Sequence, residues 1–265
     1  MNYNFNFKPG DGAMLLSFFI TIAALWLYLG IIKSSLTRKF NEDINDPEKG
    51  IIRHTLRLHV ASLVLLGILP LFIFMDFNKT YHLNKLGITL VGINVFETLK
   101  WIVSPALPII MIGWYVSKSK MSFKHYPELR IPEWDRKLII KSAFGSIIYT
   151  TGVEILFRGI FLFPIVNSIG VWPAILLNAV VFGLFITNNG KELFLQGVIL
   201  GFVFCITTLK TQTIVPAVIL HSAYHITRNL VAFYYNPEFR MVERRIPTIQ
   251  SNCELGCKCH PVDDY

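Results

Sequence analysis

Long apolar runs separated by short polar segments dominate the chain from Ala13 to Tyr235. A helix that crosses the hydrocarbon core of a bilayer takes about 20 mainly apolar residues, and seven runs approach or exceed that length. They are Ala13–Ile32, His59–Met75, Trp101–Ser117, Ser142–Ile165, Val171–Thr187, Glu192–Leu209 and Thr213–Tyr235. The pattern predicts an all-α protein, a polytopic membrane helix bundle of seven to eight transmembrane helices.

An eighth apolar stretch, Leu86–Phe96, is shorter than the others. At 1.5 Å per residue its roughly 11 residues are too few to cross a core of about 30 Å. The stretch is predicted to lie at the interface, to be re-entrant, or to join the next run as a broken helix. In the last case Pro105 and Pro108 are the expected kink sites.

The composition supports a membrane setting. Hydrophobic residues make up 53% of the 265 residues and charged residues only 16%, against about 25% charged residues in an average soluble domain. These values exclude an ordinary water-soluble enzyme and also disordered, coiled-coil and collagen-like chains. We expect a single polytopic membrane domain over residues 1–235 and a cytoplasmic, cysteine-containing tail over residues 236–265.

The net charge of +8 indicates membrane orientation rather than ligand chemistry. Lysine and arginine are concentrated in Lys33–Leu58 and in the segment after Ser117, and the alternate connections contain few of them. By the positive-inside rule both basic segments are cytoplasmic, which places the N-terminus outside and the C-terminus in the cytoplasm. Membrane lipids are expected partners and nucleic acid is not. The abundant Asn, Lys and Ile suit the plasma membrane of a microbe.

The tail contains Cys253, Cys257 and Cys259 close together. A reducing cytoplasm disfavours disulfides, so three interpretations stay open. The thiols bind a soft metal, they are acylated at the membrane, or they are unmodified in a disordered tail.

Glu154 and Arg158 lie within the fourth apolar run, one helical turn apart on the same face. A charged side chain inside a membrane is costly unless it is paired or hydrated, so each is a functional candidate. The spacing suits an internal ion pair. It also suits a catalytic carboxylate at a hydrated cavity, with Arg158 holding Glu154 ionised.

His221 and His225 form a second pair with the same spacing in the last run. Such a pair donates to an oxyanion, relays a proton or binds a metal. With Glu154 the two imidazoles would complete the ligand set of an open zinc site, although the H-E-x-x-H pattern is absent; neither a metal nor another cofactor is assigned. Interhelical hydrogen bonds account for Asn178 and Gln196.

Three stretches resemble, in order, the signatures of the CAAX-processing and bacteriocin-processing (CPBP) intramembrane endopeptidases. Gly152–Gly159 is similar to the E-E-x-x-x-R signature, Phe182–Ile186 to F-x-x-x-H, and His221–His225 to H-x-x-x-N. The resemblance covers about residues 138–232. It implies an eight-helix membrane domain with a polar cavity, in which Glu154, Arg158, His221 and His225 are the catalytic candidates.

The chain departs from the family pattern where water would be activated. Val153 stands at the first glutamate, Ile186 at the second-motif histidine and His225 at the asparagine. If the chain is active, Glu154 is the expected base, and His221 with His225 shares the proton and oxyanion work.

Three functions remain open at this stage. The first is an intramembrane endopeptidase that acts on a hydrophobic or prenylated peptide. The second is a catalytically silent relative that binds peptides or a membrane protein partner. The third is a proton-coupled transporter that uses Glu154 and His221 as a relay, although the chain shows no obvious inverted repeat.

Overall fold

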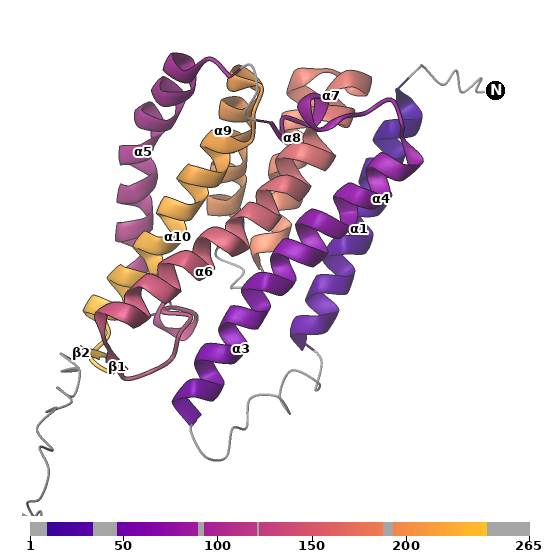
Figure 1. The fold of residues 1–265 in the computed structure, drawn as a ribbon. Coiled ribbons are helices and arrows are strands. Elements are labelled where there is room, and N and C mark those ends of the chain that lie inside the picture. Colours follow the sequence, from indigo (N-terminus) through magenta and orange to yellow (C-terminus); the bar gives the residue numbers. More distant parts are fainter. Residues whose placement is uncertain (1–9, 34–46, 90–92, 121, 188–192, 243–265) are drawn as a thin grey trace, which may run out of the picture.

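The computed structural model describes residues 10–33, 47–89, 93–120, 122–187 and 193–242, which are almost entirely helical. In chain order the elements are α1 (Asp11–Lys33), α3 (Pro47–Ser62), η1 (Leu63–Ile68), α4 (Leu69–Phe77), η2 (Leu83–Leu86), α5 (Val95–Ser117), η3 (Ser122–Lys124), β1 (Glu133–Trp134), α6 (Arg136–Glu154), η4 (Ile155–Leu162), α7 (Phe163–Ile169), α8 (Val171–Ile186), α9 (Phe194–Thr211), α10 (Val215–Tyr235) and β2 (Arg240–Met241). The helices run up and down the bundle, so the start of α1 and the strand β2 lie at opposite ends (Figure 1).

The prediction of an all-α membrane bundle is confirmed. Among the described residues, the helices long and apolar enough to cross a membrane are Asp11–Ile31, Glu48–Phe77, Val95–Ser117, Arg136–Ile169 and Phe194–Thr211. The apolar helix α8 is shorter. Large apolar side chains also cover the outside of the bundle, where Trp26 is 78% and Phe72 70% exposed. A surface of this kind suits lipid rather than water.

Two predicted elements differ most from the structure. The second run extends well beyond His59–Met75, because its helix is continuous from Glu48 to Phe77. The stretch Leu86–Phe96 is not an eighth helix: of its described residues, Leu86 ends a 3-10 turn, Gly87 adopts a left-handed conformation, and only Val95 and Phe96 are helical.

The helix α5 begins at Val95 because Asn94 caps it, accepting a hydrogen bond from the Glu97 backbone N–H at 3.1 Å. It contains Pro105 and Pro108, the two predicted kink sites, and the helix continues through both of them. The end of the apolar stretch therefore opens α5 instead of forming a helix of its own.

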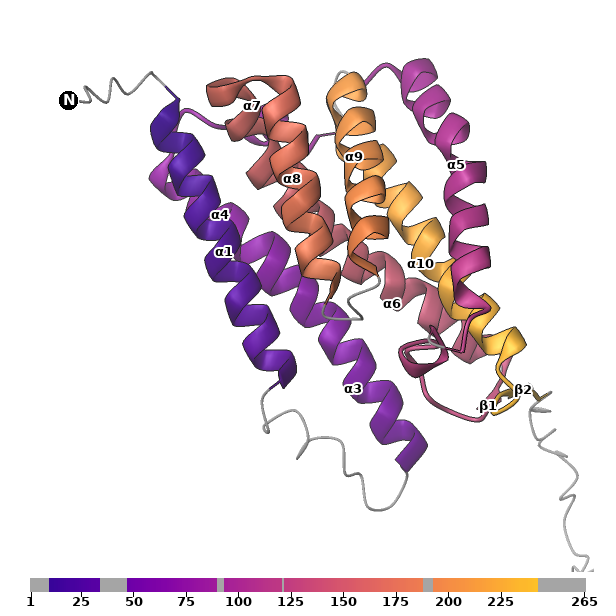
Figure 2. The ribbon, with the colours of Figure 1, turned by 180° about the vertical axis from the view of Figure 1, so that it is seen from behind.

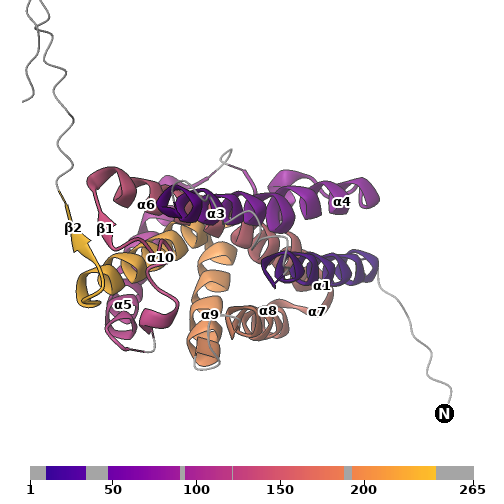
Figure 3. The same ribbon diagram turned by 90° about the horizontal axis from the view of Figure 1, so that it is seen from below.

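The helix formed by α6, η4 and α7 is the most buried of the candidate spans, with 78% of its apolar window buried against 11% for α5. Viewed from below, α3 and α4 lie along one side of the bundle and α8 and α9 along the opposite side (Figure 3). The rear view shows α8 and α9 side by side (Figure 2). The central helix thus has protein on both sides, which explains how it accommodates Glu154 and Arg158.

Glycine permits the close contact between the central helix and η1. A Cβ atom on Gly152 would lie 2.6 Å from the Ser62 carbonyl oxygen and 2.7 Å from the Leu63 Cα. Both neighbours are backbone atoms that cannot rotate away. The small residue therefore sets the distance at which the two helices pack.

A second, smaller core holds the segment between α5 and α6 against the end of α10. It consists of Leu129, Ile131, Trp134, Leu138 and Phe233. The parallel pairing of β1 with β2 adds backbone hydrogen bonds, including Arg240 N–H to the Pro132 carbonyl at 2.8 Å. Residues 126–128 directly precede this core in the chain, and Glu128 contacts His59 of α3 and His225 of α10.

Candidate functional site

The first polar cluster joins Glu154, Arg158 and His221 in the centre of the bundle. The Nε of Arg158 lies 3.2 Å from one Glu154 carboxylate oxygen, and the Nδ1 of His221 lies 2.6 Å from the other. Glu154 and Arg158 are completely buried, and His221 is 5% exposed. The ion pair expected from the helical spacing therefore forms, and His221 on α10 contacts it from a second helix.

Aromatic rings seal this first cluster. The Arg158 guanidinium lies 4.3 Å from the centre of the Phe182 ring, and the His221 ring stacks at 5.4 Å on Phe204. Arg158 also donates to the Gly201 carbonyl at 3.3 Å. The two buried charges thus offset one another in an ion pair, although Glu154 Oε2 and the Nε and Nη1 of Arg158 have no hydrogen-bond partner. Two cavities lie nearby, of about 20 Å³ and 340 Å³, and Glu154 lines neither of them.

The π-helical η4 explains part of this geometry. Arg158 lies inside η4, directly after α6 ends at Glu154. A π-helical turn widens the helix and redirects its side chains, and such turns recur at functional sites. Asn178 on α8 donates to the Phe157 carbonyl at 2.6 Å, which agrees with the interhelical hydrogen bond expected for it.

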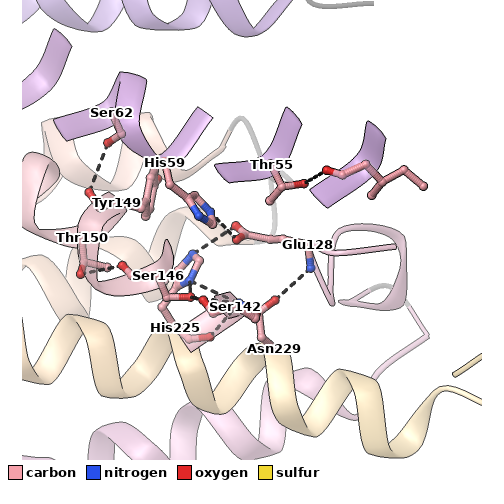
Figure 4. A network of polar contacts seen from close by, with 11 residues as sticks. Thr55, His59, Ser62, Glu128, Ser142, Ser146, Tyr149, Thr150, His225 and Asn229 are labelled. Carbon is pink, nitrogen blue, oxygen red and sulfur yellow. Dashed lines mark hydrogen bonds and ion pairs between the residues drawn. The ribbon is translucent and has the colours of Figure 1, made fainter. Parts of the chain in front are cut away.

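The second polar cluster contains His225, Glu128 and His59 (Figure 4). The Nε2 of His59 lies 3.0 Å from Glu128 Oε2, and the Nε2 of His225 lies 3.3 Å from Oε1. The three side chains come from α3, the segment before β1, and α10. One carboxylate therefore bridges two imidazoles from distant parts of the chain.

Neighbouring polar groups hold this second cluster in place. The Nδ1 of His225 lies 3.2 Å from the Ser146 hydroxyl, and Asn229 accepts a hydrogen bond from the Glu128 backbone N–H at 2.9 Å. The Tyr149 ring packs on the His225 ring at 5.2 Å. The Ser146 hydroxyl donates to the Ser142 carbonyl at 2.9 Å, so the Nδ1 of His225 is left to accept from Asn229 Nδ2, which lies 3.5 Å away.

Glu128 differs from Glu154 in its access to open space. Its side chain is 25% exposed, and it lines a cavity of about 340 Å³ together with His59, Tyr149 and Ile186. Burial alone would raise the pKa of the Glu128 carboxyl, but attraction and hydrogen bonds from His225 and His59 lower that pKa well below 4.5. Glu128 is therefore a carboxylate at neutral pH.

A smaller cavity, of about 20 Å³, adjoins the cavity of about 340 Å³. Tyr126, Tyr149, Phe185 and Ile186 line both cavities, and His221 lines the small one only. Ile186, at the position of the second-motif histidine, thus faces open space. Val153 is completely buried.

Glu154, His221 and His225 are not arranged as the three ligands of a zinc ion. His221 contacts Glu154, whereas His225 contacts Glu128, and the two imidazole rings lie 6.4 Å apart between centres. Within the described ranges no three His, Cys, Asp or Glu side chains are grouped as metal ligands. Cys253, Cys257 and Cys259 lie outside these ranges.

Sequence reasoning missed Glu128 and His59. The two residues are 69 positions apart, so no local spacing connects them. His59 stands at the start of a predicted apolar run, and Glu128 follows a proline in the basic segment after Ser117. The only available signal was a pair of titratable residues flanked by apolar neighbours, Val60 and Leu129.

Residues 135–227 match the family model described as Rce1-like, type II CAAX prenyl endopeptidase Rce1-like. The matched segment contains Glu154, Arg158, His221 and His225, and it excludes Glu128 and His59. A search of curated proteins and a search of solved structures found no match. The family match confirms the resemblance to the CPBP intramembrane endopeptidases over residues 135–227.

Proposed function

We propose that the protein is an intramembrane endopeptidase that hydrolyses hydrophobic or lipidated peptides, and that Glu128 activates the attacking water. The observation that carries the proposal is the position of Glu128, a carboxylate on the large cavity that is bridged by His59 and His225. The family match suggests a CAAX-type protease. Because Val153 replaces the first glutamate of the family motif, the base must come from another part of the chain.

The second cluster has the chemical groups that peptide hydrolysis requires. An ionised Glu128 accepts the proton of a water molecule in the cavity as that water attacks the peptide carbonyl. The two imidazoles orient the carboxylate, and their Nε2–H groups offset its charge until the proton arrives. The protonated Glu128 then gives this proton to the leaving amine, because the Nε2 atoms of His59 and His225 already carry hydrogens that point to its carboxylate.

The lining of the large cavity favours an apolar peptide. Its apolar walls come from Leu29, Leu58, Phe185 and Ile186. Its aromatic walls come from Tyr28, Tyr126 and Tyr149. Apolar walls with a few convergent polar groups are typical of binding sites. The polar groups here are those of Glu128, His54, Thr55, His59 and His125.

A silent, peptide-binding relative is the second candidate, and two observations favour it. Val153 and Ile186 occupy the family positions that activate water, and Glu154 is sealed by Arg158 and His221. In this alternative the second cluster is a structural link between α3, α10 and the segment that joins α5 to α6.

The deciding experiment is digestion of a pool of hydrophobic and prenylated peptides by the full-length protein in lipid, with products identified by mass spectrometry. We expect specific products from the wild type and from Glu133→Gln, and none from Glu128→Gln. Glu133 is the matched control because it lies in the same segment and pairs at the surface with Arg240.

Two results would overturn the proposal. One is the absence of products from the folded wild type when an active relative cuts the pool. The other is unchanged cleavage by Glu128→Gln. In the first case, cleavage gained by a Val153→Glu, Ile186→His double variant would identify the natural protein as a silent relative.

A further inference from the structure

Gly145 lies in the interior of α6, at the contact of this helix with α3. Glycine inside a helix is less favourable than alanine, because it loses more backbone freedom on folding. A glycine at such a position therefore suggests a packing or functional reason. Here a Cβ atom on Gly145 would lie 2.3 Å from the Nδ1 and 2.9 Å from the Cε1 of His59. The His59 ring occupies the space that any other side chain would fill.

This contact excludes even the methyl group of alanine. Ordinary van der Waals contact begins near 3.4 Å, so the methyl group would have to displace the His59 ring by about 1 Å. The next side chain, Leu56, has its Cδ2 atom 3.3 Å away, at the end of a flexible chain. An alanine at position 145 therefore acts on His59 before it acts on any other side chain.

The place of the His59 ring decides how the Glu128 carboxylate is held. The Nε2 of His59 lies 3.0 Å from Glu128 Oε2 (Figure 4). The other ring nitrogen, Nδ1, is buried against Gly145 without a hydrogen-bond partner. Hydrogen bonds weaken steeply when their length or angle departs from the ordinary range. A ring displaced by about 1 Å therefore loses this bond, and Glu128 keeps only one of its two imidazole donors.

The same face of α6 also supports the second imidazole. Gly145, Ser146 and Tyr149 are one and four positions apart, so they lie together on the helix. Ser146 Oγ lies 3.2 Å from the Nδ1 of His225. The Tyr149 ring packs on both imidazole rings, at 5.2 Å from His225 and 6.0 Å from His59 between centres. One helix face thus seats both histidines, and its residue without a side chain lies under His59.

We propose that Gly145 is a positioning residue of this site, and that its missing side chain lets the His59 ring lie where it holds the Glu128 carboxylate. The inference rests on the proposed function, in which that carboxylate activates water. A displacement of about 1 Å in a catalytic arrangement costs up to about 10²-fold in rate. Gly145 lines neither cavity, so the binding of a peptide should not depend on it.

The first test is peptide cleavage in lipid by Gly145→Ala, with kcat and KM measured separately. We expect kcat to fall by about tenfold to 10²-fold while KM stays the same. Gly67→Ala is the matched control, because a Cβ there lies 3.2 Å from the Cα of Gly152 and 3.3 Å from Ile155, away from the polar cluster. It should lower stability and leave the kcat of the folded protein unchanged. An unchanged kcat in Gly145→Ala, or an equal fall in both variants, would overturn the inference.

The second test is rescue by a change in His59. Glutamine at position 59 keeps an N–H donor, and its flexible chain can pass beside the alanine methyl group. In His59→Gln protein, Gly145→Ala should therefore change kcat by less than about twofold, because the steric conflict is gone. A tenfold loss in that background would show that the methyl group acts through another residue, and the inference would fail.

The free energy of unfolding gives the same comparison without catalysis. Gly145→Ala should destabilise the wild type, and it should leave His59→Gln protein unchanged or slightly more stable, since alanine favours the helix. Folding of Gly145→Ala only together with His59→Gln would support the inference, whereas failure to fold in both backgrounds would overturn it. If this coupling is found but no protein cleaves peptides, Gly145 still positions His59 and the proposed hydrolysis is what fails.

Discussion

Glu154 and Glu128 each contact a histidine of α10, yet their surroundings differ. Glu154 has no exposed surface and is closed in by Arg158 and His221. Glu128 has a quarter of its side chain exposed and lines a cavity. A carboxylate needs access to water in order to act as its base. The residues that resemble the family motif are therefore closed off, and the accessible carboxylate comes from outside them.

The largest expected effect is a loss of stability when the first polar cluster, which contains Glu154 and Arg158, is broken. Arg158→Met should lower the free energy of unfolding by about 3–5 kcal/mol, because it leaves Glu154 buried without its cation. Arg240→Met, which breaks the exposed pair with Glu133, should change stability little. Unfolding in mixed detergent micelles measures both. Equal stability of the two variants would show that Glu154 does not depend on its partner.

The next largest effect concerns the close contact of Gly152 with the backbone of Ser62 and Leu63. Gly152→Val should destabilise the fold by about 1–3 kcal/mol, because its side chain meets the Ser62 and Leu63 backbone. Gly30→Ala is the control, since a Cβ there has no atom within 4 Å. The same unfolding assay applies, and a neutral Gly152→Val would disprove the close helix contact.

The dependence of the free energy of unfolding on acid pH tests the second polar cluster. The pKa of Glu128 is lowered in the fold, by His225 and His59, from an ordinary value of 4.5. The stabilisation that this shift provides is complete above pH 4.5 and is lost as the pH falls from there through the folded-state pKa. The difference in stability between wild type and Glu128→Gln should therefore shrink below pH 4.5. A difference that grows on acidification would contradict the assigned ionisation.

The smallest effect is expected for Ser146→Ala. It removes the hydroxyl that lies 3.2 Å from His225 Nδ1 and 3.4 Å from Asn229 Nδ2, at a cost of about 1 kcal/mol. Peptide cleavage should fall severalfold while binding holds, because the imidazole loses one orienting contact. Thr151→Ala is the control, since that hydroxyl bonds only to Ile147 of its own helix. An equal effect of the two changes would remove Ser146 from the site.

Much of the fold follows from the apolar pattern. The runs that became α1, α5 and α9 are predicted by length and hydropathy alone, and the ion pair of Glu154 with Arg158 follows from helical spacing. The end of the second helix is less predictable. Its polar N-terminal part is helical to Pro47 because it packs against α6, a tertiary contact that local hydropathy does not encode.

The site itself was predictable only in part. His221 and His225 were expected to act together because they share a helix face, yet they contact different carboxylates. Glu128 reaches His225 because Leu129, Ile131 and Trp134 pack against Leu138 of α6 and Phe233 of α10. That packing depends on the end of α10 and on β2, so no segment of the sequence reveals it alone.

The central claim is that Glu128, outside the family motif, activates water. Its most direct test is kcat/KM for one peptide, measured in lipid with the wild type, Glu128→Gln and Glu133→Gln, each shown to be folded by its unfolding transition. The account predicts a loss of about 10²–10⁴-fold for Glu128→Gln and an unchanged rate for Glu133→Gln. A rate for Glu128→Gln close to that of the wild type would contradict it.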